Sequence, residues 1–188
     1  MYKFAHYLFL IYFKVFNRFR VIGAQNRIDS GPVIVCANHY SDFDVFLLTV
    51  AFRRQIHFMA KKSLFHTPVI KFFAKGYGAF PVDRGTNDLG AIKTAMRYLK
   101  DGKQIGIFPE GTRVREGDVS DAKGGVVMLA YKCKATLIPV RLKYKRKLHI
   151  FNSYEVIIDK PIKYDELGAE NGDYKNIGKE IMERIYEL

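Results

Sequence analysis

The 188-residue sequence contains only two cysteines, Cys36 and Cys133, and no Cys-x-x-Cys pair. Neither a zinc cluster nor a disulfide framework is therefore indicated, and a reducing compartment is the simplest setting. Periodic glycine and low-complexity tracts are also missing, which excludes a collagen-like or solenoid architecture. Tryptophan is absent, which by itself decides nothing. Because apolar residues make up 48% of the chain and aromatic residues 14%, intrinsic disorder is excluded as well.

Acidic residues are scarce: 19 Asp and Glu stand against 31 Lys and Arg, which gives a net charge of +12. Such a surplus favours an anionic partner, either nucleic acid, an anionic membrane, or an acidic protein or substrate. The densest basic block, Arg141–Lys147, alternates with apolar residues and is typical of a polar face at a strand end. No zinc-finger, helix-turn-helix or RNP-like motif accompanies it, so no nucleic acid is expected as partner.

No apolar run is long enough to cross a bilayer. The longest candidate, Phe4–Phe16, would form a helix of about 20 Å, whereas the hydrocarbon core measures about 30 Å. Its aromatic side chains, followed by Arg18 and Arg20, are typical of a helix that lies in the membrane interface. The alternative, an ordinary core helix, stays open, because buried helices have the same composition. No small-residue cleavage site follows, which disfavours a signal peptide. We therefore expect residues 1–20 to form a membrane-associating helix, and a monotopic or peripheral protein on the cytoplasmic face of the membrane.

Beyond this segment, short apolar runs alternate with segments of helical spacing. This alternation predicts one α/β domain over residues 21–188, with a mixed, largely parallel sheet flanked by helices. The predicted strands are Val21–Gly23, Val33–Ala37, Ile56–Ala60, Gly78–Val82, Gln104–Phe108, Thr136–Leu142, Leu148–Asn152 and Glu155–Ile158. The predicted helices are Asp42–Phe52, Lys62–Lys75, a helix capped by Thr86 or Asn87 that runs to Lys100, Gly125–Lys134 and Tyr174–Tyr186.

The most informative loop follows the run Val33–Ala37, which is apolar throughout and so typical of a strand buried on both faces. His39 comes between this strand and the next helix, at the position where α/β sheets bind ligands. Asp44 can reach the imidazole nitrogen that does not react, fix its tautomer and stabilise the imidazolium. The alternative is structural: Ser41 and Asp44 have the spacing of a helix capping box, and His39 could be an ordinary buried histidine.

Two further loops follow predicted strands and carry charge. Phe108–Arg113 holds Glu110 and Arg113, and Gly78–Arg84 ends in Arg84. Each loop is separately explained as a turn with solvated charges, but together they place one His, one Glu and two Arg at successive strand ends. Arginine offers a planar set of donors that suits phosphate oxygens. A histidine base beside such arginines, with no Ser or Cys nucleophile, indicates direct transfer onto a substrate hydroxyl.

Four blocks in order resemble the lysophosphatidate acyltransferase family of the glycerolipid acyltransferase superfamily. They are Asn-His-x-Ser-x-x-Asp at 38–44, Gly-x-Phe-Pro-Val-Asp-Arg at 78–84, Phe-Pro-Glu-Gly-Thr-Arg at 108–113 and Ile-Pro-Val at 138–140. Residues 60–65 and the pair Lys123-Gly124 are also similar, so that the resemblance covers about residues 20 to 165.

The resemblance implies acyl transfer from an acyl carrier protein or coenzyme A thioester to the sn-2 hydroxyl of 1-acyl-glycerol 3-phosphate. It implies no metal and no cofactor beyond that thioester. His39 would be the general base and Asp44 its orienting partner. The residues expected to hold the acceptor phosphate are Arg84, Arg113 and Lys61, and those expected to shape the acceptor site are Glu110, Gly111 and Thr112. Lysophosphatidate, the thioester and an anionic membrane surface are the expected partners.

Three positions depart from the family pattern: Tyr40, Ser63 and Val114 stand where the family commonly has Gln, Glu and Ser. None of them is a predicted catalytic group. They leave open an acyltransferase that acts on another lysolipid or on glycerol 3-phosphate. A different class, a non-catalytic basic module that binds lipid or nucleic acid, is the remaining alternative.

Overall fold

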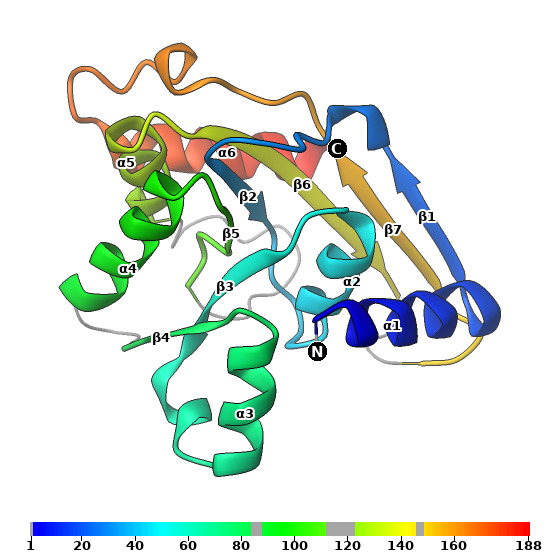
Figure 1. The fold of residues 1–188 in the computed structure, drawn as a ribbon. Helices are drawn as coiled ribbons and strands as arrows, with labels where there is room; N and C mark the ends of the chain where they lie inside the picture. Colours follow the sequence, from blue (N-terminus) through cyan, green and yellow to red (C-terminus); the bar gives the residue numbers. More distant parts are fainter. Residues whose placement is uncertain (1, 84–87, 112–122, 146–148) are drawn as a thin grey trace.

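The computed structural model describes residues 2–83, 88–111, 123–145 and 149–188, in which seven strands form one sheet between two layers of helices (Figure 1). The strands are β1 (Arg18–Ile22), β2 (Val33–Ala37), β3 (Ile56–Lys61), β4 (Phe80–Val82), β5 (Gln104–Ile107), β6 (Thr136–Tyr144) and β7 (Ser153–Ile158). The α-helices are α1 (Tyr2–Phe16), α2 (Asp44–Ala51), α3 (Pro68–Gly76), α4 (Leu89–Lys100), α5 (Gly125–Lys132) and α6 (Tyr174–Glu187). Short 3₁₀ helices are η1 (Ala24–Asn26), η2 (Lys62–Phe65) and η3 (Tyr164–Glu166).

The strand order is β1-β7-β6-β2-β5-β3-β4. Strands β6, β2, β5, β3 and β4 run parallel to one another, whereas β7 pairs antiparallel with β6 and β1 runs parallel to β7. The predicted mixed, largely parallel α/β sheet is thereby confirmed. The parallel strands all end at the same side, which we call the carboxyl edge, and ligands of open α/β sheets bind at this edge.

Strand β2 shows why the sheet is buried on both faces. Its five residues are all buried, and they alternate between the two layers of helices. Val33 and Val35 belong to the cluster that packs on α1 and α2, whereas Ile34 and Cys36 belong to the cluster formed with α4, α5 and α6. The continuous apolar run predicted this arrangement, because a strand with only one covered face would alternate apolar and polar residues.

Helix α1 has two apolar faces. On one face, Phe13 is fully buried and Phe9 stacks on Phe46 of α2 with 4.0 Å between the ring centroids. The opposite face exposes a stripe of large apolar side chains with helical spacing: Phe4, Tyr7, Leu8, Ile11 and Val15. One face of α1 therefore packs in the core, as in the first interpretation that the sequence left open, whereas the other leaves large apolar side chains exposed. The helix ends at Phe16 and residues 18–20 belong to β1, so the helix is shorter than the 1–20 segment.

The prediction of a strand over Leu148–Asn152 is wrong in its described part. Residues 149–152 form a turn, and β7 begins only at Ser153. Because β6 and β7 are antiparallel, the chain must reverse between them, and Phe151 adopts a left-handed φ of 57° to do so. The apolar residues of this segment favoured a strand, but the chain reversal overrides that local preference.

Two further predictions need correction. Helix α4 is capped by Asp88, whose side chain accepts a hydrogen bond from the Ala91 amide at 3.0 Å, and not by Thr86 or Asn87, which lie outside the described residues.

The basic block at 141–147 is not solvated throughout: Arg141 is buried, with its guanidinium 4.4 Å from the centroid of the Tyr186 ring. Because successive side chains of a strand point to opposite faces of the sheet, Arg141 of β6 points toward α6.

Among the described residues, no helix combines the length and the apolar content that a bilayer crossing requires.

Candidate active site

His39 and Asp44 lie side by side at the carboxyl edge. His39 follows the end of β2, and Asp44 is the first residue of α2. The imidazole Nδ1 lies 3.0 Å from Asp44 Oδ2, and both side chains are buried. The structure thus brings together the two residues that the sequence analysis proposed as base and orienting partner.

The helix capping box that the sequence left open is not formed at the start of α2, because the helix begins at Asp44 and its N-cap Phe43 has no side-chain cap hydrogen bond. Asp44 instead holds the loop that precedes the helix. Its Oδ2 accepts hydrogen bonds from the backbone amides of Tyr40 at 2.7 Å and Ser41 at 2.9 Å. The amide of Phe43 donates in turn to the Ser41 hydroxyl at 3.3 Å. One carboxylate therefore holds the backbone of the loop and the imidazole at once.

The second oxygen of Asp44 is held by a distant residue. Tyr144, at the end of β6, donates its hydroxyl to Asp44 Oδ1 at 2.5 Å. Burial, together with the negative charge of Asp44, raises the pKa of Tyr144 above its ordinary value, so that the phenol remains a proton donor. With this bond every oxygen of the buried carboxylate has a partner, which satisfies the requirement for burying such a charge.

The plane of the imidazole is fixed by Phe108. The two rings stack with 4.0 Å between their centroids and 15° between their planes. Phe108 directly follows β5, the strand beside β2. Because Asp44 occupies Nδ1 and Phe108 covers a face of the ring, Nε2 is the nitrogen available to a substrate.

Asn38 anchors the loop to the neighbouring strand. Its amide nitrogen donates to the Leu142 carbonyl at 3.1 Å, and its oxygen accepts from the Leu142 amide at 2.7 Å. Both groups belong to the backbone of β6, so the side chain continues the ladder where β2 has ended. His39 is thereby held at a fixed distance from β6.

Glu110 supports the His39 loop from the opposite side. It is only 2% exposed, and its carboxylate accepts from the His39 backbone amide at 2.8 Å and from the Tyr186 hydroxyl of α6 at 2.6 Å. Burial raises the pKa of Glu110 to about 7, although these two hydrogen bonds act in the opposite direction. The described contacts of Glu110 thus connect the site to the C-terminal helix.

The raised pKa of Glu110 predicts a pH-dependent stability. Between its ordinary pKa of 4.5 and the folded value of about 7, the folded protein holds a proton here that the unfolded chain has lost. The free energy of unfolding therefore falls as the pH rises through this window, by roughly 3 kcal/mol at most. Glu110→Gln is neutral at every pH and keeps an acceptor for the His39 amide, so this contribution should vanish. Denaturant midpoints of both proteins between pH 4.5 and 8 measure the difference, and parallel curves would contradict the raised pKa.

A cavity of about 300 Å³ opens beside His39 at the carboxyl edge. Most of its wall is apolar and comes from β3, β4, α4, β5 and α5: Met59, Val82, Ala91, Ile92, Ile107, Val126, Met128 and Leu129. Gly111 and Lys123 line it near the loop that follows β5. Gly111 has a left-handed φ of 69°, and a Cβ there would lie 3.2 Å from the Lys123 side chain. The cavity can hold an extended apolar group with its polar end at His39.

The predicted phosphate ligands are only partly placed by the structure. Lys61 ends β3 with an exposed side chain and is not part of the cavity wall. Arg84, Arg113 and Thr112 lie outside the described residues. Within the described part of the chain, no group of three or more His, Cys, Asp or Glu could hold a metal ion.

Sequence reasoning missed the residues that reach the site from far along the chain. Tyr144 and Tyr186 bond to Asp44 and Glu110 across separations of 100 and 76 residues. Lys123 was noted only as part of a pair similar to the family and proves to line the cavity. The sequence pointed only to Lys123, through its similarity to the family. Tyr144 and Tyr186 are isolated tyrosines at a strand end and a helix end, and no local pattern marks them.

Three comparisons agree on the relatives of this chain. The family model described as Acyltransferase matches residues 18–143. The 1-acyl-sn-glycerol-3-phosphate acyltransferase of Bacillus subtilis is 42% identical over 141 residues, which are 74% of this chain and 69% of that protein. The enzyme of the same name from Borreliella burgdorferi is 31% identical, over 70% of this chain and 54% of its own length.

Among solved structures, the crystal structure of the 1-acyl-sn-glycerophosphate acyltransferase from Thermotoga maritima has a TM-score of 0.75. The match covers 100% of this chain and 77% of that one, at 24% sequence identity, and it supports the fold.

Proposed function

The chain belongs to the Acyltransferase family, and on that premise we propose that it transfers an acyl chain from a thioester to the sn-2 hydroxyl of 1-acyl-sn-glycerol 3-phosphate, which yields phosphatidate. The single observation that carries this proposal is the buried His39–Asp44 pair at the wall of an apolar cavity. The proposed substrate is the one after which both relatives are named. The chain spans 69% of the first relative and 54% of the second.

In this reaction Nε2 of His39 accepts the proton of the acceptor hydroxyl as its oxygen attacks the thioester carbonyl. A carbon–oxygen bond forms, and the tetrahedral intermediate then breaks its carbon–sulfur bond. The leaving thiolate takes up the proton from the imidazolium, so that atoms and charge balance. A thioester is already activated, and a positioned hydroxyl with a base therefore suffices without a covalent enzyme intermediate.

Each neighbour of His39 has a role in this scheme. Asp44 accepts a hydrogen bond from Nδ1–H, and its charge stabilises the imidazolium that forms when Nε2 takes up the proton; Tyr144 keeps that carboxylate in place. The Glu110 carboxylate fixes the backbone on which His39 stands. These residues act on the base and its orientation and not on the substrate.

The apolar cavity wall and the basic residues near the site are proposed to bind different parts of the substrate. The apolar wall suits a hydrocarbon chain, and Lys123 places a positive charge at the same cavity. Together with Lys61, Arg84 and Arg113, Lys123 is proposed to bind the acceptor phosphate, because charge-assisted bonds to phosphate are strong. The net charge of +12 also suits an acidic acyl carrier protein or the phosphates of coenzyme A as donor.

The exposed face of α1 supports attachment to a membrane surface. Its stripe of large apolar side chains, Phe4, Tyr7, Leu8, Ile11 and Val15, has no covering element in the described structure. A helix of this kind lies in the interface with its apolar face in the lipid. We therefore propose that the protein binds peripherally to a membrane, on its cytoplasmic face.

Thiol release tests the proposed function. Purified protein receives a saturated acyl-CoA or acyl carrier protein thioester, with and without 1-acyl-glycerol 3-phosphate. Release should require the acceptor, and phosphatidate should accumulate in equal amount. Glycerol 3-phosphate and lysolipids with other headgroups serve as control acceptors. Release with one of these and not with lysophosphatidate would overturn the acceptor assignment, and release with none of them would overturn the transferase itself.

A further inference from the structure

His39 is held by side chains that continue the sheet beyond the ends of its strands. The ladder between β2 and β5 ends with the pair Cys36 and Ile107, and the backbone amide of His39 lies beyond it. The Glu110 carboxylate takes the place of the next ladder acceptor, at 2.8 Å from that amide. On the other side of the loop, the Asn38 side chain extends the pairing with β6 in the same way. The position of the imidazole therefore depends on where Glu110 is held.

The other oxygen of Glu110 is held by the last turn of the C-terminal helix. Tyr186 of α6 donates its hydroxyl to Glu110 Oε1 at 2.6 Å. Burial, the hydrogen bond to Glu110 and the charge of that carboxylate raise the pKa of Tyr186, so that the phenol remains a proton donor. A buried carboxylate needs donors on its oxygens, and within the described chain Glu110 receives them from the His39 amide and from Tyr186.

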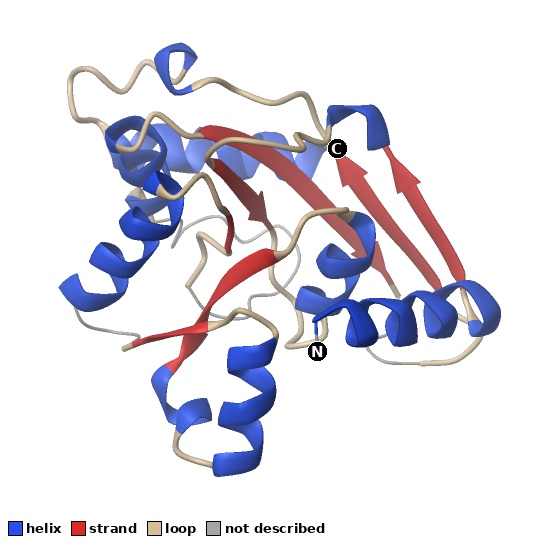
Figure 2. Ribbon diagram, in the orientation of Figure 1, coloured by secondary structure: helices blue, strands red, loops and turns tan. Residues whose placement is uncertain are grey.

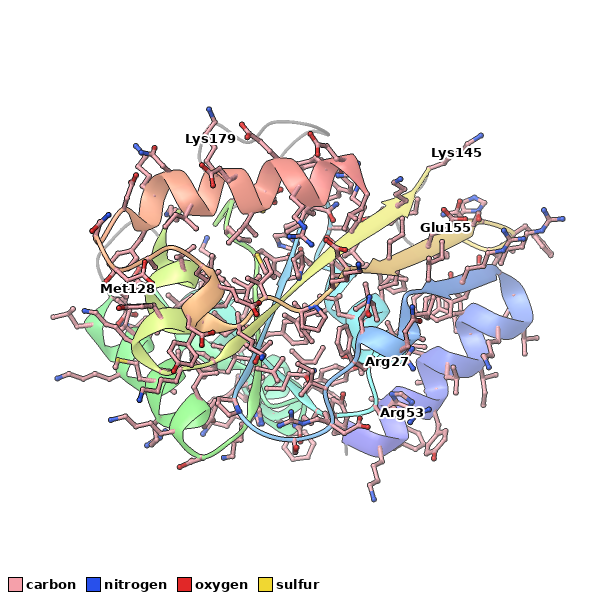
Figure 3. The ribbon with its side chains drawn as sticks, turned by 90° about the horizontal axis from the view of Figure 1, so that it is seen from above. Arg27, Arg53, Met128, Lys145, Glu155 and Lys179 are labelled. Carbon is pink, nitrogen blue, oxygen red and sulfur yellow. The ribbon has the colours of Figure 1, made fainter. Side chains whose placement is uncertain are left out.

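The turn that carries Tyr186 is itself firmly attached. Helix α6 lies on the face of the sheet opposite α1 and α2 (Figure 2), and Ile185 on its inner side is fully buried. Lys179 on its outer side points away from the sheet (Figure 3). In the last turn, Arg184 donates to the carboxylate of Asp159, the residue after β7, at 2.6 Å. Residues on both sides of Tyr186 in the sequence thus fix its backbone.

The ring of Tyr186 packs against a buried cation. The guanidinium of Arg141 lies 4.4 Å from the centroid of the Tyr186 ring and 5.9 Å from that of Tyr40, the residue after His39. A guanidinium in such a position is attracted by the π-electrons of the ring. The ring therefore has a defined place, from which its hydroxyl reaches Glu110.

We propose that Tyr186 is a positioning residue of the active site, which holds His39 in place through the Glu110 carboxylate. The last turn of α6 thereby becomes part of the site, although it lies outside residues 18–143, which the family model matches. This inference rests on the proposed function in one respect, namely that His39 is the base. Because Tyr186 does not line the cavity, its removal should affect the chemical step and not the binding of substrate.

Removal of the Tyr186 hydroxyl should also change the ionisation of Glu110. Burial raises the pKa of Glu110 to about 7, and the hydrogen bond from Tyr186 acts against that increase. In Tyr186→Phe this pKa should therefore rise further, so that more of Glu110 is protonated at neutral pH. The groups that face this carboxyl from the elements around it are the His39 amide, Asp44, Arg141, Tyr186 and the Cys36 thiol.

NMR of protein with ¹⁵N-labelled histidine tests the contact without any substrate. The chain has five histidines, and the backbone amide signal of His39 is identified by its loss in His39→Gln. In the wild type this signal should move with pH as Glu110 titrates near pH 7. In Tyr186→Phe the midpoint should lie about one pH unit higher, since a hydrogen bond to a charged group has been removed. In Glu110→Gln the movement that Glu110 causes should vanish.

The matched control is Tyr174→Phe, which removes a hydroxyl from the same helix. Among the described residues no partner bonds to this hydroxyl, so the variant should titrate like the wild type. Tyr186→Phe itself keeps the ring on Arg141 and should remain folded, which urea denaturation checks. An unchanged midpoint of the His39 amide in Tyr186→Phe would overturn the inference.

Acyl transfer gives the second readout. Tyr186→Phe should lower the maximal rate about tenfold and leave the half-saturating acceptor concentration unchanged, because a small displacement of a catalytic group is costly. The loss should be largest at acidic and neutral pH and smaller at higher pH, since a protonated Glu110 holds the His39 amide less firmly than the carboxylate does. A loss by the same factor at every pH would indicate a merely structural role and overturn the inference.

A double-mutant cycle with Glu110→Gln shows whether Tyr186 acts through Glu110. In the Glu110→Gln background, Tyr186→Phe should cause a much smaller further loss than in the wild type, because residues that act through one contact are not additive. Losses that simply multiply would overturn the inference. A displaced NMR midpoint in a protein without acyl transfer would support the positioning of His39 by Tyr186 and overturn only the proposed function.

Discussion

Replacement of His39 by Ala is expected to lower acyl transfer by about 10²–10⁴-fold, the usual contribution of a general base. His39 is only 3% exposed, with Nδ1 on Asp44 and one face on Phe108, and among the described residues it is the only histidine at the cavity wall. The rate of thiol release at saturating acceptor measures this loss. The concentration of acceptor needed for half-maximal rate should change far less, because a base acts mainly in the transition state.

Two further variants serve as controls for the loss of activity in His39→Ala. His39→Gln retains most of the side-chain volume beside Phe108 but cannot act as a base near neutral pH, and it should be as inactive as His39→Ala. His66→Ala removes an exposed histidine outside the cavity wall and should retain full activity. Near-normal turnover by His39→Gln would show that His39 is not the base and would remove the mechanism derived from this site.

Replacement of Asp44 is expected to have two separable effects. Asp44→Asn can place its amide oxygen where Oδ2 accepts from His39, Tyr40 and Ser41, and its NH₂ can donate to Tyr144. The loop and the tautomer are then preserved, and only the charge that stabilises the imidazolium is lost. We expect activity to fall on the order of 10²-fold or more, with a free energy of unfolding close to that of the wild type.

Asp44→Ala should behave differently, because it leaves the donors of Tyr40, Ser41 and Tyr144 without an acceptor. Each unpaired buried donor costs about 1–3 kcal/mol, so this variant should lose several kcal/mol of stability in addition to its activity. Urea denaturation together with thiol release separates the two effects. Equal destabilisation by Asn and Ala would show that the charge of Asp44 maintains the fold, and full activity of Asp44→Asn would show that the imidazolium does not depend on it.

The sequence was informative where the chemistry is local. The pattern of β2, the loop that follows it and the five-residue separation of His39 and Asp44 together predicted the contact between the imidazole and the carboxylate. When two residues are so close in sequence across a turn, few backbone conformations keep their side chains far apart. The same holds for β5 and the loop that carries Glu110, whose position at a strand end could be read directly from the chain.

The apolar segments were harder to interpret. Residues 149–152 had the composition of a strand, and only the antiparallel pairing of β6 with β7 makes them a turn. The composition of α1 could not say whether its apolar residues face the core or the solvent. Both are true, because Phe9 and Phe13 pack inward while Phe4 and Ile11 remain exposed.

By itself the sequence determined the α/β class, the strand ends that carry His39 and Glu110, the nearby position of Asp44, and the surplus of positive charge. These properties depend on residue type and short-range spacing, which a chain carries before it folds. The tertiary structure decided what surrounds those groups: Tyr144 on Asp44, Tyr186 on Glu110, and Phe108 stacked on His39. Such contacts join residues far apart in the chain, and their geometry exists only once the sheet has set the distances between the elements.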